Sequence, residues 1–292
     1  MIGPELPATM TLRATYVARE PVSLPAFLGG TLHGALGHAL HAIDPRLDSL
    51  IQGGTPPPEA PGFVRASPPS PVVLVPPRLA EPRTLLAYER LELGLVLIGP
   101  AVVDVGVILA ALQGVGDRGL GRGRGRLQLV EVRDDVGQRV WAGGRVRSAP
   151  GLDRTAVLSS GGALTLRPRT PLQILRGGRV VSEPTPADLV GAAARRCVAL
   201  AWTFGSGLEL SVRELESAAR GQLEGRGEWT LLEATRWSSR QQQRHPVGGV
   251  MGSIRITGDL EPFMPYLGAC VRVGLGKGTA LGLGLFDLTV GL

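Results

Sequence analysis

Three of the four histidines in this 292-residue chain stand in one short stretch, FLGGTLHGALGHALHAI. They are His33, His38 and His41, whereas His245 stands far along the chain. An imidazole titrates close to neutral pH, so a histidine can take up and release a proton as a general base or acid. The sequence therefore offers His38, His41 and His33 as candidate catalytic residues.

The spacing of apolar residues predicts that this stretch is a helix. Apolar residues recur at helical intervals, at Leu32, Leu36, Leu40 and Ile43. Pro45 ends the pattern. At about 100° per residue, His38 and His41 lie about 60° apart on the face opposite the apolar stripe. His33 flanks the stripe. We expect His38 and His41 to face outward, either to meet a ligand or as ordinary solvated residues; the pattern does not choose between the two histidines.

The basic residues point to a polyanionic partner. The chain has 31 lysines and arginines, of which Lys277 is the only lysine, with a net charge of +6 and an isoelectric point near 10.3. The densest basic cluster alternates with glycine in GLGRGRGR, where missing side chains allow close approach to a backbone. We predict that this cluster contacts a polyanionic backbone, with a solvated turn as the alternative. Its members are Arg118, Arg122, Arg124 and Arg126.

A second basic group stands in TRWSSRQQQRH, inside a stretch from Trp229 to Gln243 that alternates like a strand. In a strand, every second residue shares a face. We therefore predict a phosphate-binding stripe, with a charged, solvated edge strand as the alternative. Its RNA-binding residues are Arg236, Ser238, Arg240 and Arg244. His245 lies near the end of this strand and is a weaker catalytic candidate than the other histidines.

The C-terminal stretch VGLGKGTALGLGLF is a glycine-rich loop around Lys277. A P-loop needs lysine directly before serine or threonine and a helix to follow, but Gly278 separates Lys277 from Thr279 and a strand follows. A dinucleotide fingerprint also needs a helix and a later acidic residue. Two interpretations remain: Lys277 and Thr279 bind a nucleic-acid phosphate, or the loop is a turn with a solvated lysine. The loop glycines are Gly274, Gly276, Gly278, Gly282 and Gly284.

An internal repeat predicts the fold. Each half of the chain reads as strand, helix, strand, strand, helix, glycine-rich loop and strand, and LVLIGP in the first half matches IRITGD in the second. We predict an α+β protein of two tandem ferredoxin-like (RRM-like) domains. Each domain has an antiparallel sheet with helices on one face and a glycine-rich loop before the last strand. The alternative is a fold of two β-sheets.

The predicted domains are 1–148, which carries the candidate catalytic helix, and 163–292, joined by a linker at 149–162. The first domain has strands at 11–17, 91–98, 126–132 and 139–146, a helix within 27–43 and a helix at 101–113. The region 53–77 is mainly irregular, with PVVLV as a short strand. The second domain has an extended, hairpin-like segment at 163–175, helices at 186–204, 211–220 and 261–269, and strands at 229–243, 250–257 and 283–290.

The cysteines and the apolar segments indicate the cellular compartment in which we expect the protein. Cys197 and Cys270 provide neither zinc-ligand spacing nor a disulfide framework, which favours a reducing, cytoplasmic setting. The N-terminus has no signal-peptide pattern. The longest apolar window is interrupted by Pro100 and Asp104, so it predicts a strand and a helix rather than a membrane span.

The residues from Arg236 to Leu288 carry a specific resemblance. They contain S-S-R-Q, P-x-G-G, G-D-L-x-P-F and G-x-G-K-G-T-x-x-G-L-G in order. This block resembles the C-terminal domain of the CRISPR repeat-processing endoribonucleases, the sixth CRISPR-associated protein family in the repeat-associated mysterious protein (RAMP) superfamily. In the N-terminal half, LGGTLHGALGHAL, LIGPA and GLGRGRGR are also similar to family segments.

The resemblance implies two ferredoxin-like domains and a catalytic histidine on the first helix. It also implies cleavage of CRISPR repeat RNA without metal or cofactor: the ribose 2′-OH attacks the adjacent phosphate and leaves a 2′,3′-cyclic phosphate. The partners expected are repeat RNA and the processed CRISPR RNA, with effector-complex subunits and a homodimer left open and no membrane. Two departures stand out: the proline-rich 53–77 region replaces a cysteine-rich segment of many relatives, and His33 stands where relatives often have arginine.

Two other functions stay open at this point. An inactive RNA-binding subunit would bind the RNA without cutting it. A purely structural protein–protein module would show no salt-dependent affinity for RNA.

Overall fold

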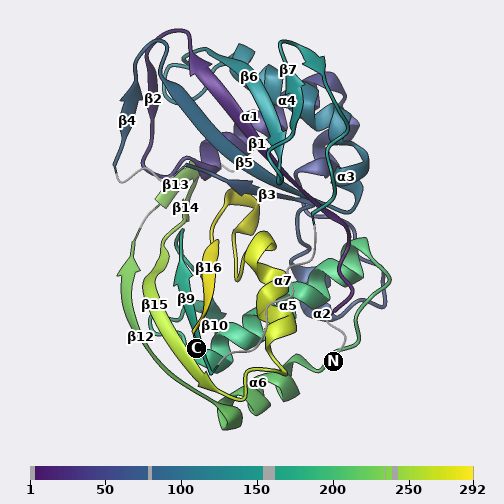
Figure 1. Cartoon of the computed structure of the whole chain (residues 1–292), viewed down its shortest axis with the longest axis vertical. Coiled ribbons are helices and arrows are strands. Elements are labelled where there is room, and N and C mark those ends of the chain that lie inside the picture. Colours follow the sequence, from purple (N-terminus) through teal and green to yellow (C-terminus); the bar gives the residue numbers. More distant parts are fainter. Residues whose placement is uncertain (1–3, 78–80, 154–161, 234, 239–242, 292) are drawn as a thin grey trace. The chain divides into compact units, whose positions relative to one another are not determined.

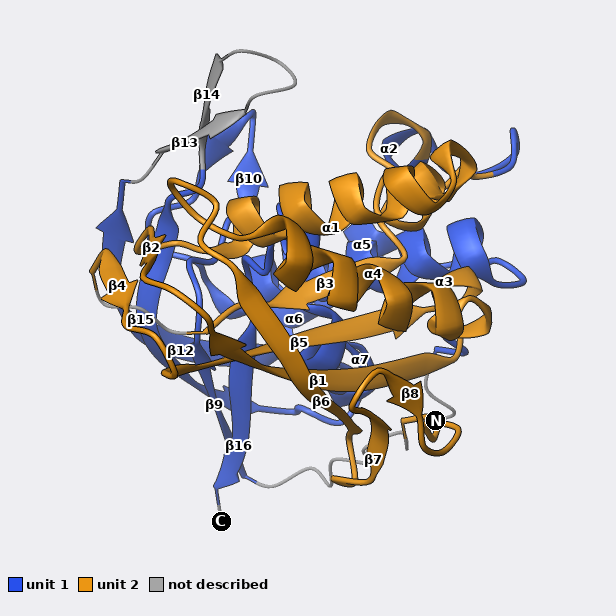
Figure 2. Ribbon diagram, turned by 90° about the horizontal axis from the view of Figure 1, so that it is seen from above, with its two compact units in different colours: residues 1–6, 57–64, 155–292 blue, residues 7–56, 65–154 orange. Residues whose placement is uncertain are grey.

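The computed structural model describes residues 4–77, 81–153, 162–233, 235–238 and 243–291. The chain divides into two compact units (Figure 2). Unit 1 comprises residues 1–6, 57–64 and 155–292, and unit 2 comprises residues 7–56 and 65–154. No helix in the described ranges is long and apolar enough to cross a membrane.

Unit 2 is built on one antiparallel sheet with the strand order β3-β5-β1-β6-β7-β8 (Figure 1). The strands are β1 (Thr9–Ala18), β3 (Val72–Val75), β5 (Arg90–Ile98), β6 (Leu127–Asp134), β7 (Arg139–Ala142) and β8 (Arg145–Val146). Helix α1 (Gly29–Ile43) comes between β1 and β3, and helix α4 (Val105–Arg118) between β5 and β6. The first four strands and two helices thus give the ferredoxin-like order of elements.

Smaller elements complete unit 2. A short ribbon pairs β2 (Val22–Leu24) with β4 (Arg83–Leu85). The 3-10 helix η1 (Pro45–Leu50) follows α1, and the short helix α3 (Pro100–Val103) precedes α4. Helix α2 (Gly62–Ala66) lies where the chain passes from unit 1 back to unit 2.

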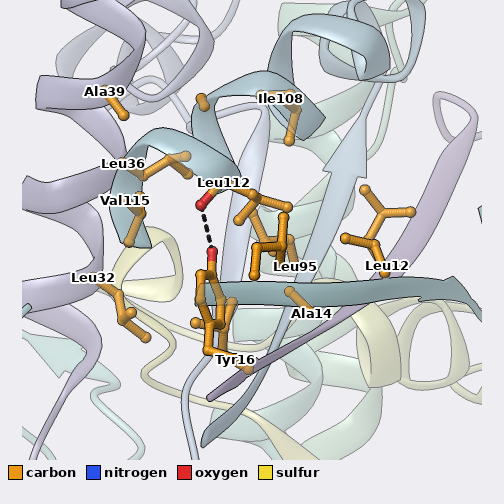
Figure 3. Packing of buried hydrophobic residues seen from close by; sticks show 14 of the residues in the cluster. Leu12, Ala14, Tyr16, Leu32, Leu36, Ala39, Leu95, Ile108, Leu112 and Val115 are labelled. Atoms are coloured by element: carbon orange, nitrogen blue, oxygen red, sulfur yellow. Dashed lines mark hydrogen bonds between the residues drawn. The ribbon is translucent and has the colours of Figure 1, made fainter. Parts of the chain in front are cut away.

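The core of unit 2 follows from the alternation in β1. Leu12, Ala14 and Tyr16 are buried on one side of this strand and pack with the apolar faces of α1 and α4 (Figure 3). The Tyr16 hydroxyl donates a hydrogen bond to the carbonyl oxygen of Leu112 on α4 at 2.7 Å. Burial, with a smaller contribution from Asp117, raises the pKa of Tyr16 far above its ordinary value. The sheet and α4 are therefore joined by both packing and a buried hydrogen bond.

Unit 1 repeats this plan. Its sheet has the order β12-β15-β9-β16, all antiparallel. The strands are β9 (Ala163–Pro168), β12 (Leu223–Leu232), β15 (Gly249–Gly258) and β16 (Phe286–Gly291). The helices are α5 (Pro186–Phe204), α6 (Val212–Gln222), α7 (Met264–Val273) and the 3-10 turn η2 (Thr279–Leu281). Two short ribbons pair β10 (Leu175–Arg176) with β11 (Arg179–Val180), and β13 (Thr235–Ser238) with β14 (Gln243–Pro246).

The α+β prediction is confirmed, with an antiparallel sheet in each half. Helix α5 has the predicted limits because its start is encoded locally. Pro186 stands in the first turn, and Thr185 and Asp188 form a reciprocal capping box. The predicted second helix of this half is also present, as α6.

Four predicted elements need correction. The strand predicted at 139–146 is two short strands, β7 and β8, which pair antiparallel. The strand predicted at 229–243 is two strands, since β12 ends at Leu232 and β13 reverses into β14. The helix predicted at 101–113 is divided at Asp104 into α3 and α4. The segment 163–175 forms no hairpin with itself, because β9 pairs with β15 and β16, while β10 pairs with β11.

Candidate functional site

Helix α1 presents two histidines to solvent. Leu32, Leu36, Ala39 and Leu40 are buried on one side of the helix. His38 and His41 are exposed on the other side, as the helical spacing predicts. Ile43 is a correction, because it is 50% exposed and lies outside the buried stripe. The core therefore fixes the helix so that two imidazoles can meet a large ligand.

The third histidine of α1 has a different environment. His33 is half-buried, and its Nε2 lies 3.3 Å from the carbonyl oxygen of Ile51. That carbonyl also accepts a hydrogen bond from the Ser70 hydroxyl at 3.0 Å. His33 thus belongs to the packing between α1 and the segment after η1, and its ring is less accessible than those of His38 and His41.

His41 contacts a carboxylate. Its Nδ1 lies 3.3 Å from both Oδ1 and Oδ2 of Asp48, a residue of η1. The sequence analysis did not identify Asp48. The only signal for it was Pro45, which ends α1 and starts the turn that brings η1 back toward the helix.

The backbone of the N-terminal glycine-arginine loop is held by hydrogen bonds, and its arginine side chains are exposed. The Arg122 N–H donates to the Ser23 carbonyl oxygen at 3.1 Å, so the loop extends the β2 ribbon. The Arg126 N–H donates to Oε1 of Glu20 at 2.8 Å. These backbone contacts use no guanidinium. All four predicted arginines are exposed, namely Arg118, Arg122, Arg124 and Arg126.

One of these arginines lies beside the histidine helix. A Cβ placed on Gly114 would lie 3.0 Å from Nη1 of Arg118 and 3.5 Å from Cβ of Ala39. Gly114 belongs to α4, and Ala39 follows His38 on α1. The absence of a side chain at Gly114 therefore lets the Arg118 guanidinium lie where α4 packs against α1.

The C-terminal glycine-rich loop connects α7 to β16 and holds Lys277 outward. Lys277 is exposed, while its N–H donates to the Gln173 carbonyl oxygen at 2.9 Å. Gly276 has a φ of +73°, and a Cβ there would lie 2.3 Å from the same carbonyl oxygen. Only glycine fits this close backbone approach. The loop is thus rigidly placed, with the ammonium group free to meet a phosphate.

Thr279 differs from the prediction. It is only 7% exposed, and its γ-methyl would lie 3.0 Å from a Cβ on Gly274. The packing of the loop against itself turns this residue inward. Thr279 therefore shapes the loop, and a direct contact between its hydroxyl and a phosphate has no support from its position. Gly278 and Gly282, which flank η2, and Gly284 all have left-handed φ values.

The predicted arginine stripe is also changed. Arg236 and Ser238 belong to β13 and Arg244 to β14, while Arg240 lies outside the described residues. The register pairs Arg236 with His245 and Trp237 with Arg244. Since the chain reverses between Ser238 and Gln243, these residues do not follow one another along a single strand. The prediction that these residues share one face of a single continuous strand is therefore wrong. Their role in RNA binding stays a prediction.

The described residues contain no group of three or more His, Cys, Asp or Glu side chains placed to hold a metal ion. The histidine helix and the glycine-arginine loop belong to unit 2, whereas Lys277 and β13 belong to unit 1.

Two family models match separate parts of the chain. Residues 166–286 match the family model of the CRISPR-associated endoribonuclease Cas6. Residues 50–151 match a second family model, described as an N-terminal domain. No curated protein matches.

Solved structures agree with this result at the level of the fold. A Cas6 product complex shares 18% identity at a TM-score of 0.61, with 97% of this chain and 99% of the other covered. Cas6 of Thermus thermophilus shares 16% identity at a TM-score of 0.59, with 98% and 100% covered. A Cas6-RT-Cas1–Cas2 complex shares 12% identity at a TM-score of 0.63, with 100% of this chain and 48% of that chain covered.

The ordered motifs, the sheet in each half and the family-model match agree: residues 166–286 are similar to the CRISPR-associated endoribonuclease Cas6, in a chain that has the fold of solved Cas6 structures.

Proposed function

We propose that this protein cleaves CRISPR precursor RNA within its repeats, without a metal ion. The ribose 2′-OH at the cleavage position attacks the adjacent phosphorus, the bond to the 5′ oxygen breaks, and the product ends in a 2′,3′-cyclic phosphate. The reaction needs a base for the 2′-OH proton, an acid for the leaving oxygen and positive charge near the phosphorane. The match of residues 166–286 to the Cas6 endoribonuclease model supports this activity.

The observation that carries the proposal is the exposure of His38 and His41 on α1, with the Arg118 guanidinium where α4 meets that helix. A histidine side chain is a common general acid or base, and an arginine favours developing negative charge. The other exposed arginines of the loop and Lys277 would bind the RNA backbone. These side chains are the kinds of group that cleavage by 2′-OH attack requires.

The test is cleavage of the cognate repeat RNA by purified protein in EDTA. We expect cutting at one position, and no cutting when that position carries a 2′-deoxyribose. Replacing both His38 and His41 by alanine should abolish cleavage and preserve RNA binding. A requirement for divalent metal, or cleavage of the deoxy substrate, would contradict the mechanism.

The same assay separates the alternatives. Salt-dependent binding of the repeat without cutting by the wild-type protein would identify an inactive RNA-binding subunit. No salt-dependent RNA affinity at all would favour a structural protein–protein module.

A further inference from the structure

We propose that Asp48 is a positioning residue for His41, and that His41 rather than His38 exchanges a proton with the RNA through Nε2. This inference rests on the proposed function and deepens it, because it selects one histidine and assigns a role to a residue outside α1. It is carried by the contact between η1 and the exposed side of α1.

The contact fixes the orientation of the imidazole. Nδ1 of His41 lies 3.3 Å from each carboxylate oxygen of Asp48. An ionised carboxylate only accepts hydrogen bonds, so Nδ1 must donate its proton. In the neutral ring, Nε2 then carries the lone pair and can act as a base. The His41 side chain is 58% exposed, which leaves room for a substrate on the other edge of the ring.

The fold holds Asp48 in place for this contact. Leu50 and Ile51 are buried in the unit 2 core, and Leu47 packs against that core. The Asp44 N–H donates to the Leu40 carbonyl oxygen, so the chain turns directly at the end of α1. η1 is therefore anchored on both sides of Asp48. Its carboxylate is placed by the core rather than by the histidine itself.

A second acid near the end of α1 is occupied by another partner. The Asp44 carboxylate accepts hydrogen bonds from the backbone and the guanidinium of Arg46. The side-chain bond from Arg46, followed by its backbone bond, holds the pKa of Asp44 below its ordinary value. Arg46 thus engages Asp44, and Asp48 is left to engage His41. Sequence distance alone would not distinguish these two acids.

The two other histidines of α1 have different surroundings. His33 is half-buried, and its Nε2 lies 3.3 Å from the backbone carbonyl oxygen of Ile51. For His38 the described residues supply neither a hydrogen bond nor an ion pair. A proton-transfer group works best when its ring is held in the productive tautomer and orientation. This requirement favours His41 over the equally exposed His38.

The first experiment measures the tautomer and needs no RNA. In protein with ¹⁵N-labelled histidine, at a pH where the imidazoles are neutral, we expect His41 to carry its proton on Nδ1. Asp48→Ala should shift the proton toward Nε2, the tautomer that an unconstrained imidazole favours. Asp48→Asn keeps an acceptor oxygen and should retain more of the Nδ1–H form. Glu92→Ala, which removes an exposed acid from β5, is the matched control and should leave the ring signals unchanged.

The second experiment is a double-mutant cycle on single-turnover cleavage of the repeat RNA. Asp48→Ala should lower the cleavage rate about tenfold or more, without changing the dissociation constant for RNA. Asp48→Asn should keep more of the rate than Asp48→Ala. Adding Asp48→Ala to His41→Ala should cause no further loss, because a positioning residue acts only through the residue it positions.

The outcomes separate this inference from the proposed function. If the wild-type protein cleaves but His41→Ala keeps the full rate, the assignment of His41 is overturned while the proposed function stands. An equal fold loss from Asp48→Ala with or without His41 would show that Asp48 acts independently of His41, which would overturn the inference. An Nε2–H tautomer in the wild-type protein would also overturn the inference. Absence of any cleavage by the wild-type protein would instead count against the proposed function.

Discussion

The guanidinium of Arg196 donates from Nε and Nη2 to the carbonyl oxygen of Val273, at 3.3 and 3.0 Å. Arg196 lies on α5, and Val273 is the last residue of α7, where the glycine-rich loop begins. Burial lowers the pKa of Arg196 to about 10, although the neighbouring Cys270 and Cys197 act in the opposite direction. The buried side chain of Arg196 thus connects α5 to the end of α7, the helix that leads into the loop of Lys277.

We therefore expect Arg196→Ala to lower the free energy of unfolding by about 2–4 kcal/mol. The variant loses the packing of a buried stem and leaves the Val273 carbonyl without this donor. Chemical denaturation measures the effect. Arg195→Ala is the matched control, because Arg195 is 40% exposed and its pair with Glu216 contributes little. Equal losses in the two variants would contradict the anchoring role of Arg196.

The capping box of α5 predicts a dependence of stability on pH. Burial of Asp188 raises its pKa, but hydrogen bonds from Thr185 and then Arg176 outweigh burial, so the pKa lies below its ordinary value. The ionised carboxylate therefore stabilises the fold above the pKa of the unfolded chain, and this stabilisation is lost as the pH falls through the lower pKa of the folded chain.

Asp188→Asn should lower stability by about 1 kcal/mol at neutral pH and have a smaller effect in acid. Unfolding measured from neutral to acid pH tests this expectation. Asp104→Asn is the control, since Asp104 precedes α4 without a side-chain capping bond. A loss that stays constant across the acid range would contradict the linkage.

Replacing Arg124 should change the affinity for RNA without lowering the stability of the fold. Its φ of +53° lies in the left-handed region, which is strained for a residue with a side chain. Arg124→Gly should leave stability unchanged or slightly raised, because relief of strain offsets the greater freedom of the unfolded chain. RNA affinity should fall, since an exposed guanidinium is removed. Arg122→Gly, at a position without positive φ, should lower both stability and affinity.

Lys277→Ala should weaken RNA binding across different sequences. Loss of one phosphate contact reduces the slope of log affinity against log salt by about 0.7–0.9. Stability should be unaffected, because the loop is held by the Lys277 backbone N–H and not by its side chain. Binding measured over a series of salt concentrations tests this. An unchanged slope would mean that the lysine is only solvated.

Gly276→Ala should destabilise unit 1 by about 2–4 kcal/mol, because it combines a positive φ with a clash against the Gln173 carbonyl oxygen. Gly123→Ala is the control for strain alone, since Gly123 also has positive φ but nothing lies within 4 Å of an added Cβ. Its cost should be about 1 kcal/mol. Equal thermal stability of the two variants would contradict the close approach at Gly276.

The parts of this protein that could be predicted are those governed by local periodicity and capping. The alternation of Thr9–Ala18 gives β1, and the capping box with Pro186 gives the start of α5. The spacing in α1 gives the exposure of His38 and His41. Each of these features depends on residues within one or two turns of one another, so neighbouring residues contain the information.

Elements defined by which strands pair and which side chains pack inward could not be predicted in the same way. The alternation around Arg236 runs on without a break, yet β13 and β14 form a hairpin. Thr279 has a polar side chain in a glycine-rich loop, which suggested exposure, but the loop packs this residue inward. Alternation and composition contain no information on which surfaces the chain brings together.

The amino-acid sequence by itself determined the order of elements in each half, the position of the histidines on one helix and the motifs that resemble an RNA-processing family. Only the tertiary structure decided that Asp48 meets His41 and that Arg196 meets Val273. Both contacts follow from where buried leucines and helices pack, because close packing of the core sets the position of each polar side chain that leaves it.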